Sequence, residues 1–140
     1  MLNEHGGIVD DVIVYQLSFE EYLIVVNAAN VEKDFSWFES HLVGNAQLED
    51  RTSEIALFAI QGPKSRAFLE TVFSVDLSGL CYYHFTKSKV PGGELLLSKT
   101  GYTGEEGFEI FCPKDQSEQL WQRLFEAGAP FGLKSIGFGA

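Results

Sequence analysis

The sequence has few cysteines, few histidines and few basic residues for its length. Its two cysteines and three histidines are scattered over 140 positions, so they match neither the spacing of a zinc site nor a disulfide framework. We therefore expect no metal site, and free thiols in a reducing compartment. Ten basic residues stand against 20 acidic ones, giving a net charge of −10. This balance disfavours nucleic acids and anionic membranes as partners, because it leaves little positive charge to meet them.

Long apolar runs are also missing. No run approaches the roughly 20 residues that cross a bilayer, and the N-terminus lacks a charged-then-apolar leader. We therefore expect an intracellular protein without a membrane partner. What the sequence does have is 45% hydrophobic and 14% aromatic residues. This composition favours a globular protein with a packed core, built as one domain or as a small domain plus part of another.

A glycine-rich stretch at residues 100–109 (TGYTGEEGFE) organises the second half of the sequence. It lies between apolar runs at 95–97 and 108–111, which predicts a strand, a sharp turn and a returning strand. Glycine tolerates positive φ and allows a ligand or another backbone to approach closely. Glu109 is then an acid within a strand. From the pattern alone it is either a rim glutamate on an ordinary hairpin or an acid that accepts paired hydrogen bonds from a planar, N–H-rich ring.

The first part of the sequence predicts a β-hairpin. Residues 6–15 and 22–27 are rich in β-branched residues, with apolar positions on both faces. Asp10 and Asp11 fall inside the first predicted strand. Since strand side chains alternate, the two carboxylates should point to opposite faces and cannot share one proton. Either one is exposed while the other bonds nearby main chain, or one of them serves a ligand.

A helix is predicted from Asn30, as its N-cap, to about Leu42. The polar stretch at 47–53 then predicts a boundary, so we expect domains at residues 1–50 and 51–140. The second domain should contain, in order, a strand at 55–60, a helix after Pro63, strands near 81–88 and 95–97 joined by a turn at 91–93, the returning strand, a helix at about 115–128 and a final strand within 132–140. The expected class is α+β, with a partial first domain (hairpin plus helix) followed by a ferredoxin-like β-α-β-β-α-β unit truncated at its C-terminal end.

Four stretches together resemble the folate-binding aminomethyltransferases, the T-proteins of the glycine cleavage system. They are residues 6–15 (GGIVDDVIVY), 25–30 (VVNAAN), 59–63 (AIQGP) and 99–109 (KTGYTGEEGFE). The resemblance runs from end to end of this chain and covers only the middle of the family's longer sequence. We therefore expect a central fragment with a T-protein-like fold, without the family's N-terminal part and C-terminal barrel-like domain.

The resemblance implies a reaction. The family takes an aminomethyl group from the dihydrolipoyl arm of the H-protein, releases ammonia and passes the one-carbon unit to tetrahydrofolate. It implies the lipoylated H-protein and tetrahydrofolate as partners and no metal. It also implies the bacterial cytoplasm, our preferred location, or the mitochondrial matrix of a eukaryote.

The resemblance also implies site residues. Asp11 matches the family's key acid, where a carboxylate would stabilise the iminium-like cation formed as ammonia leaves. Val25 and Asn27 match the pterin-contacting pair on the second strand. Tyr102 and Glu109 match the loop that packs on the pterin, whose 2-amino group and adjacent N–H offer two donors to a glutamate.

The sequence departs from the family pattern in two places. Lys99 stands where the family usually has arginine, so the planar fork of donors is lost. The sequence also stops at residue 140, immediately before an arginine-containing segment that completes the family's folate pocket. We therefore expect the 140-residue chain alone to lack aminomethyl transfer and to bind folate weakly.

Three alternatives remain open. The chain could be the folate-binding domain of a dimethylglycine- or sarcosine-type dehydrogenase, whose gene would also encode a flavin-binding domain. The related iron–sulfur-assembly factor is disfavoured, because its reactive cysteine falls where Thr100 and Gly101 stand here. The third alternative is a structural fragment without activity of its own.

Overall fold

The computed structural model describes residues 1–90 and 93–137 and divides the chain into two compact units, Met1–Asp50 and Arg51–Ala140. The division falls inside the polar stretch at residues 47–53. Within the described residues, no helix combines the length and the apolar character that crossing a bilayer requires.

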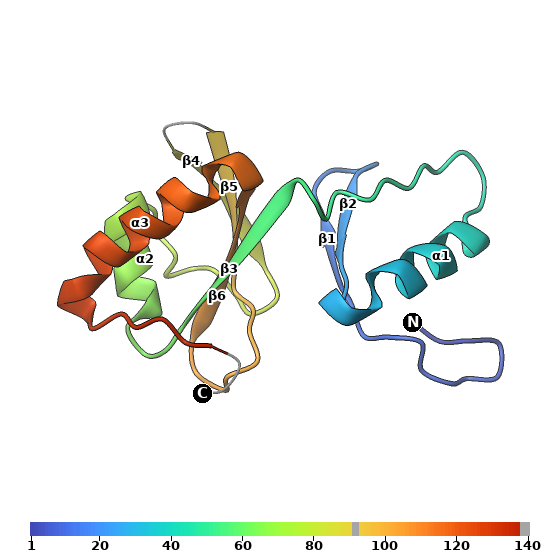
Figure 1. Ribbon diagram of the computed structural model, residues 1–140, viewed down its shortest axis with the longest axis horizontal. Helices are drawn as coiled ribbons and strands as arrows, with labels where there is room; N and C mark the ends of the chain where they lie inside the picture. The colour runs from blue at the N-terminus through green and yellow to red at the C-terminus, as the bar shows by residue number, and fades with distance from the viewer. Residues whose placement is uncertain (91–92, 138–140) are drawn as a thin grey trace. The chain divides into compact units, whose positions relative to one another are not determined.

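The first unit contains an antiparallel hairpin and one helix (Figure 1). Strands β1 (Ile13–Gln16) and β2 (Tyr22–Val25) pair in the register Ile13↔Val25. The first strand is shorter than predicted, because residues 9–12 are not part of it. The main-chain amide of Asp11 donates to Oδ1 of Asp10 at 3.0 Å, a local bond of the kind that competes with strand pairing. The prediction that both aspartates lie in a strand was therefore wrong, but Asp11 is exposed and Asp10 is buried and bonded to nearby main chain, as the first alternative stated.

The short 3-10 helix η1 (Ala28–Asn30) leads into helix α1 (Val31–His41), where a helix was predicted. Asn30 occupies the N-cap position, but its side chain makes no capping bond to the helix. The prediction of an Asn30 cap was therefore wrong; the amide binds Asp10 instead. The only fully buried residue of α1 is Asp34, whereas Phe35 and Phe38 of the predicted apolar stripe are partly buried.

The second unit is a four-stranded antiparallel sheet in the order β3-β6-β5-β4, with two helices on one side (Figure 1). Its elements are β3 (Ile55–Gln61), α2 (Ser65–Phe73), β4 (Phe85–Val90), β5 (Gly93–Ser98), β6 (Gly107–Pro113), η2 (Lys114–Gln116), α3 (Ser117–Gly128) and η3 (Ala129–Phe131). The buried core lies between the sheet and the helices. It includes Phe68 and Leu69 of α2, Leu95 and Leu97 of β5, Phe108 and Ile110 of β6, and Leu120 and Leu124 of α3.

These elements confirm the α+β class, while their order differs in detail from the ferredoxin-like expectation. The described order is β-α-β-β-β-α, and no strand follows α3 as far as residue 137. Residues 138–140, in the predicted last strand, and residues 91–92, in the predicted turn, lie outside the described residues. The strand predicted at 81–88 begins only at Phe85, because residues 82–83 form a turn.

Strand alternation in β6 gives the sheet two different faces. Phe108 and Ile110 point into the core, so Glu109 between them points to the face away from α2 and α3. In the register of the sheet, Glu109 lies between Ala59 of β3 and Ser98 of β5. Its carboxylate is therefore held at the centre of a paired sheet rather than on a mobile rim.

Candidate functional site

In the first unit, the polar centre is the carboxylate of Asp10. It is 8% exposed and accepts from Nδ2 of Asn27 at 2.9 Å, from Nδ2 of Asn30 at 3.0 Å and from the main-chain amide of Asp11 at 3.0 Å. These donors come from the loop before β1, the residue pair after β2 and the start of α1. One buried acid therefore ties together three segments of the hairpin and helix, which explains why a charged residue is tolerated there.

A second buried acid faces Asp10. The carboxyl of Asp34 is 0% exposed and lies within hydrogen-bonding reach of the Asp10 carboxyl. The bond from Asp34 holds the pKa of Asp10 well below its usual range, against the effect of burial and with help from Asn30, Asn27 and the amide of Asp11. Burial, followed by the bond to Asp10 and its negative charge, raises the pKa of Asp34. The pKa values of these two neighbouring carboxyls are therefore shifted in opposite directions.

The structure brings two of the three predicted residues of this unit into contact. Asp11 is exposed, and Nδ2 of Asn27 lies 3.1 Å from its main-chain oxygen and 3.4 Å from its Oδ1. Val25 ends β2 and is partly buried, opposite Ile13. Asp11 thus presents a carboxylate to solvent beside the Asn27 amide, while the buried Asp10 holds both in place.

In the second unit, Glu109 lies in a small polar group on the sheet. It is 9% exposed, and its Oε2 accepts from Oγ1 of Thr100, which lies 3.0 Å from Oγ of Ser98. Thr100 and Ser98 are both buried. Among the described residues, no donor reaches the other carboxylate oxygen, Oε1, and this oxygen is not sealed from the surface. Glu109 therefore keeps one oxygen for a further donor.

Three tyrosines, Tyr82, Tyr83 and Tyr102, lie near the loop of this carboxylate. The hydroxyl of Tyr82 donates to the main-chain oxygen of Gly101 at 3.3 Å. The rings of Tyr82 and Tyr83 pack edge-on, with their centroids 4.4 Å apart. Partial burial raises the pKa of Tyr82, and the neighbouring Tyr83, Tyr102 and Glu109 raise it further. Tyr102 is 80% exposed on the loop. Tyr82 is therefore near enough to both Tyr102 and Glu109 for each to raise its pKa.

The glycines of the loop make room for the side chain of Gln61. Its Nε2 donates to the main-chain oxygens of Thr100 and Phe108, each at 3.2 Å, and its Oε1 accepts from Oγ1 of Thr103 at 3.2 Å. A Cβ on Gly107 would lie 1.8 Å from Oε1 of Gln61, and one on Gly101 would lie 2.2 Å from it. The close approach predicted at these glycines is thus made by a side chain of β3.

Lys99 takes part in an ion-pair network at the base of the loop. Glu106 binds the guanidinium of Arg66 through both of its oxygens, and Nζ of Lys99 lies 3.2 Å from Oε1 of Glu106. Arg66 lowers the pKa of Glu106, and Lys99 adds to the effect. The main-chain oxygen of Glu106 also accepts from the amide of Gly62 at 2.8 Å and from Oγ of Ser65 at 2.9 Å. In this chain Lys99 helps fix the loop to α2.

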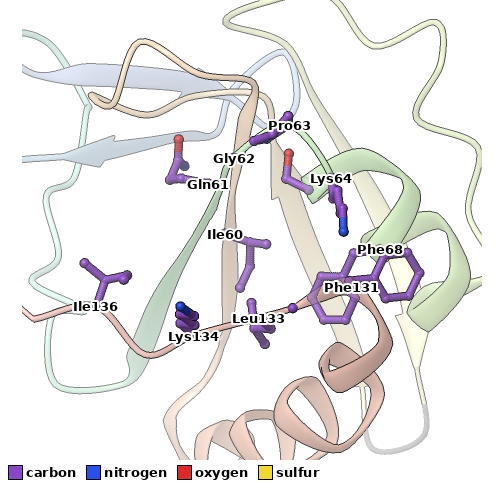
Figure 2. Close-up of a pocket in the computed structure, with 12 residues that line it drawn as sticks. Ile60, Gln61, Gly62, Pro63, Lys64, Phe68, Phe131, Leu133, Lys134 and Ile136 are labelled. Atoms are coloured by element: carbon purple, nitrogen blue, oxygen red, sulfur yellow. The ribbon is translucent and has the colours of Figure 1, made fainter.

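A pocket of about 320 Å³ lies elsewhere in the second unit (Figure 2). Figure 2 shows the rings of Phe68 and Phe131 side by side at one end of it, with centroids 5.4 Å apart. Lys64 and Lys134 also line it, and Gln61 lies at its other side. The pocket contains neither Glu109 nor Tyr102 and is separate from the carboxylate site.

A family model described as the GCVT N-terminal domain matches residues 1–140. The chain belongs to this family. It is 47% identical to an aminomethyltransferase of Bacillus cereus (strain B4264) and 46% identical to one of Chloroherpeton thalassium, in each case over 100% of this chain. It spans only 38% and 39% of the lengths of these two relatives.

Solved structures agree with this membership. The glycine cleavage system aminomethyltransferase T from Bartonella henselae matches with a TM-score of 0.74 and 31% identity, over 89% of this chain and 33% of that one. A heterotetrameric sarcosine oxidase from Corynebacterium sp. U-96 matches with a TM-score of 0.72 over 94% of this chain and 66% of that one. At 18% identity, the second match shows a shared fold alone.

The GCVT N-terminal domain described here contains polar residues that sequence patterns did not single out. They are Asp34, Gln61, Thr100 and Tyr82. An acid within an otherwise amphipathic helix was the one available signal, at Asp34. Across residues 1–90 and 93–137, no three His, Cys, Asp or Glu side chains are grouped to hold a metal ion.

Proposed function

We propose that the full-length protein containing this chain transfers a one-carbon unit to tetrahydrofolate. The donor is the aminomethyl group on the dihydrolipoyl arm of a lipoylated H-protein, and ammonia is released. The family match over the whole chain and the relatives named aminomethyltransferase support this activity. The site of action is the bacterial cytoplasm or, in a eukaryote, the mitochondrial matrix, and the free thiols of Cys81 and Cys112 suit these reducing compartments.

The observation that carries the proposal is the carboxylate of Glu109. It is nearly buried, one of its oxygens accepts from Thr100, and the other lacks a donor among the described residues. A carboxylate so placed is poorly solvated and gains from a ligand that supplies N–H donors. The pterin ring of tetrahydrofolate offers such an edge, from its 2-amino group and the adjacent N–H.

The exposed ring of Tyr102 supplies an aromatic surface for the same ligand. Tyr102 is 80% exposed, and planar aromatic groups stack favourably on such a ring. Tyr82 and Tyr83 add further ring surface at this place. The pterin would therefore meet a carboxylate at its edge and tyrosines near its face.

Asp11 supplies the charge for the chemical step. As the C–N bond to the departing ammonia lengthens, positive charge develops on the methylene carbon that the folate amine attacks. The exposed carboxylate of Asp11 stabilises that charge and accepts the proton that the attacking amine loses. Asn27 holds Asp11 through its main-chain oxygen, and Val25 and Asn27 together contact the pterin.

The test uses the full-length protein, with ammonia release measured as a function of tetrahydrofolate and H-protein. We expect turnover that requires both, and Glu109→Gln should weaken tetrahydrofolate binding by about 1.5–3 kcal/mol, or about 10- to 150-fold. The control is Glu105→Gln, because Glu105 is exposed on the same loop. Equal tetrahydrofolate affinities for the two variants would show that the pterin edge is bound elsewhere. A tightly bound flavin in the purified protein would favour the dehydrogenase alternative.

A further inference from the structure

Asp34 is a buried acid whose carboxylate lacks a normal partner. It is 0% exposed, and neither of its oxygens accepts a hydrogen bond from the described residues. Nζ of Lys33 lies 3.7 Å from Oδ1, beyond hydrogen-bond distance, and donates instead to the main-chain oxygen of Val9 at 2.7 Å. An ionised carboxylate in this position would be costly, because nothing replaces the water it has lost.

The neighbouring carboxylate has the opposite surroundings. Asp10 accepts three N–H bonds, from Asn27, Asn30 and the amide of Asp11. All of these donors favour its ionised form. Two facing carboxyl groups in one buried site hold a shared proton, and the donors around Asp10 place that proton on Asp34.

We propose that Asp34 is a neutral carboxylic acid that donates a hydrogen bond to Asp10 and thereby positions Asn27 and Asp11 for one-carbon transfer. Asp34 is a positioning residue, since Asp10 lies between it and the reacting groups. The proposal rests on the proposed function for the role of Asp11. The protonation of Asp34 is independent of that role.

The charges around the pair agree with this assignment. Burial is the main cause that raises the pKa of Asp34, and the bond from Asp34 is the main cause that lowers the pKa of Asp10. Both shifts favour the proton on Asp34. Two cationic groups are near. Lys33 is directed to the main-chain oxygen of Val9, and the amino group of Met1 donates to the main-chain oxygen of Asp10 at 2.7 Å. Lys33, 3.7 Å from Oδ1 of Asp34, lowers the pKa of Asp34, but burial and the charge of Asp10 raise it more.

The arrangement explains how Asp11 is held although it is exposed. A single Nδ2 group of Asn27 contacts Oδ1 of Asp10, the main-chain oxygen of Asp11 and, at 3.4 Å, Oδ1 of Asp11. The position of Asn27 therefore depends on a charged, fixed Asp10. If Asp34 did not donate, Asp10 would lose the bond that opposes the cost of its own burial.

The experiment compares Asp34→Asn with Asp34→Leu in the full-length protein, with Glu39→Gln on the exposed side of α1 as the matched control. An asparagine can still donate an N–H to Asp10, so we expect its kcat to stay within about threefold of the wild type. Leucine cannot donate, and we expect kcat to fall by about tenfold or more. A purely packing role predicts instead that Asp34→Leu lowers Tm while kcat per folded molecule is unchanged. That result, or an equal loss of kcat in both variants, would overturn the proposal.

A spectroscopic measurement decides the protonation state even if Asp34→Leu fails to fold. Infrared difference spectra at neutral pH should show the carbonyl band of a protonated carboxylic acid that Asp34→Asn removes and Glu39→Gln retains. If this band is missing from the wild type, or survives in Asp34→Asn, Asp34 is not the neutral donor. This readout does not require activity. Failure of the proposed function would appear separately, as a full-length protein without transfer to tetrahydrofolate.

Discussion

The substitution Gly107→Ala tests why the loop after β5 is rich in glycine. An alanine Cβ would lie 1.8 Å from Oε1 of Gln61, so the Gln61 side chain must leave. It would then lose two bonds to main-chain oxygens and one from Thr103. At about 0.5–1.5 kcal/mol each, three bonds amount to about 1.5–4.5 kcal/mol.

The expected net cost is smaller than that sum. Alanine recovers about 0.5–1 kcal/mol relative to glycine within a strand. We therefore expect local opening of the loop to become about 1–3.5 kcal/mol easier. This corresponds to about 5- to 400-fold faster hydrogen exchange at the amides of residues 100–107, measured by mass spectrometry on the full-length protein.

A double-mutant cycle separates this explanation from others. In a Gln61→Ala background the obstruction is gone, so adding Gly107→Ala should change the opening free energy by less than about 1 kcal/mol. Gly104→Ala is the control: Gly104 has φ +77° and no atom near its Cβ position, so its cost of about 1–2 kcal/mol should be the same in both backgrounds. If Gly107→Ala is equally costly with and without Gln61, the loop needs glycine there for another reason, and the packing argument is refuted.

Two further predictions concern the acids of the first unit. Asp11→Asn should lower kcat of the full-length protein by about 100-fold or more while leaving its circular dichroism unchanged. The control Glu20→Gln, which changes an exposed acid of the hairpin, should leave kcat unchanged. Near-normal turnover of Asp11→Asn would remove Asp11 from the mechanism. Because bonding lowers the pKa of Asp10 in the folded state, its stabilising contribution is present above about pH 4 and is lost as the pH falls below that value. The opening free energy of residues 1–50, derived from amide exchange relative to the intrinsic rate at each pH, should therefore fall below about pH 4. Asp10→Asn should remove most of this pH dependence. An unchanged profile in that variant would show that other acids control it.

The general organisation of this GCVT N-terminal domain was predictable from the sequence because its signals are local. Runs such as 55–60 and 108–111, separated by glycine-rich turns, predict strands of an α+β protein. The helix after Asn30 was also found, since its pattern needs only neighbouring residues. The motifs at 6–15 and 99–109 were specific enough to indicate the family.

Tertiary structure alone decided which acids are buried and what holds them. Asp10 and Asp11 are equivalent in sequence, yet one is enclosed and the other exposed, because the donors to Asp10 come from residues 17 and 20 positions later. The sequence did not single out Asp34, which meets Asp10 across 24 positions of chain. Gln61 likewise binds the loop from 39 and 47 positions away. Burial and hydrogen bonding of a polar side chain depend on partners distant in sequence, and only the folded chain specifies them.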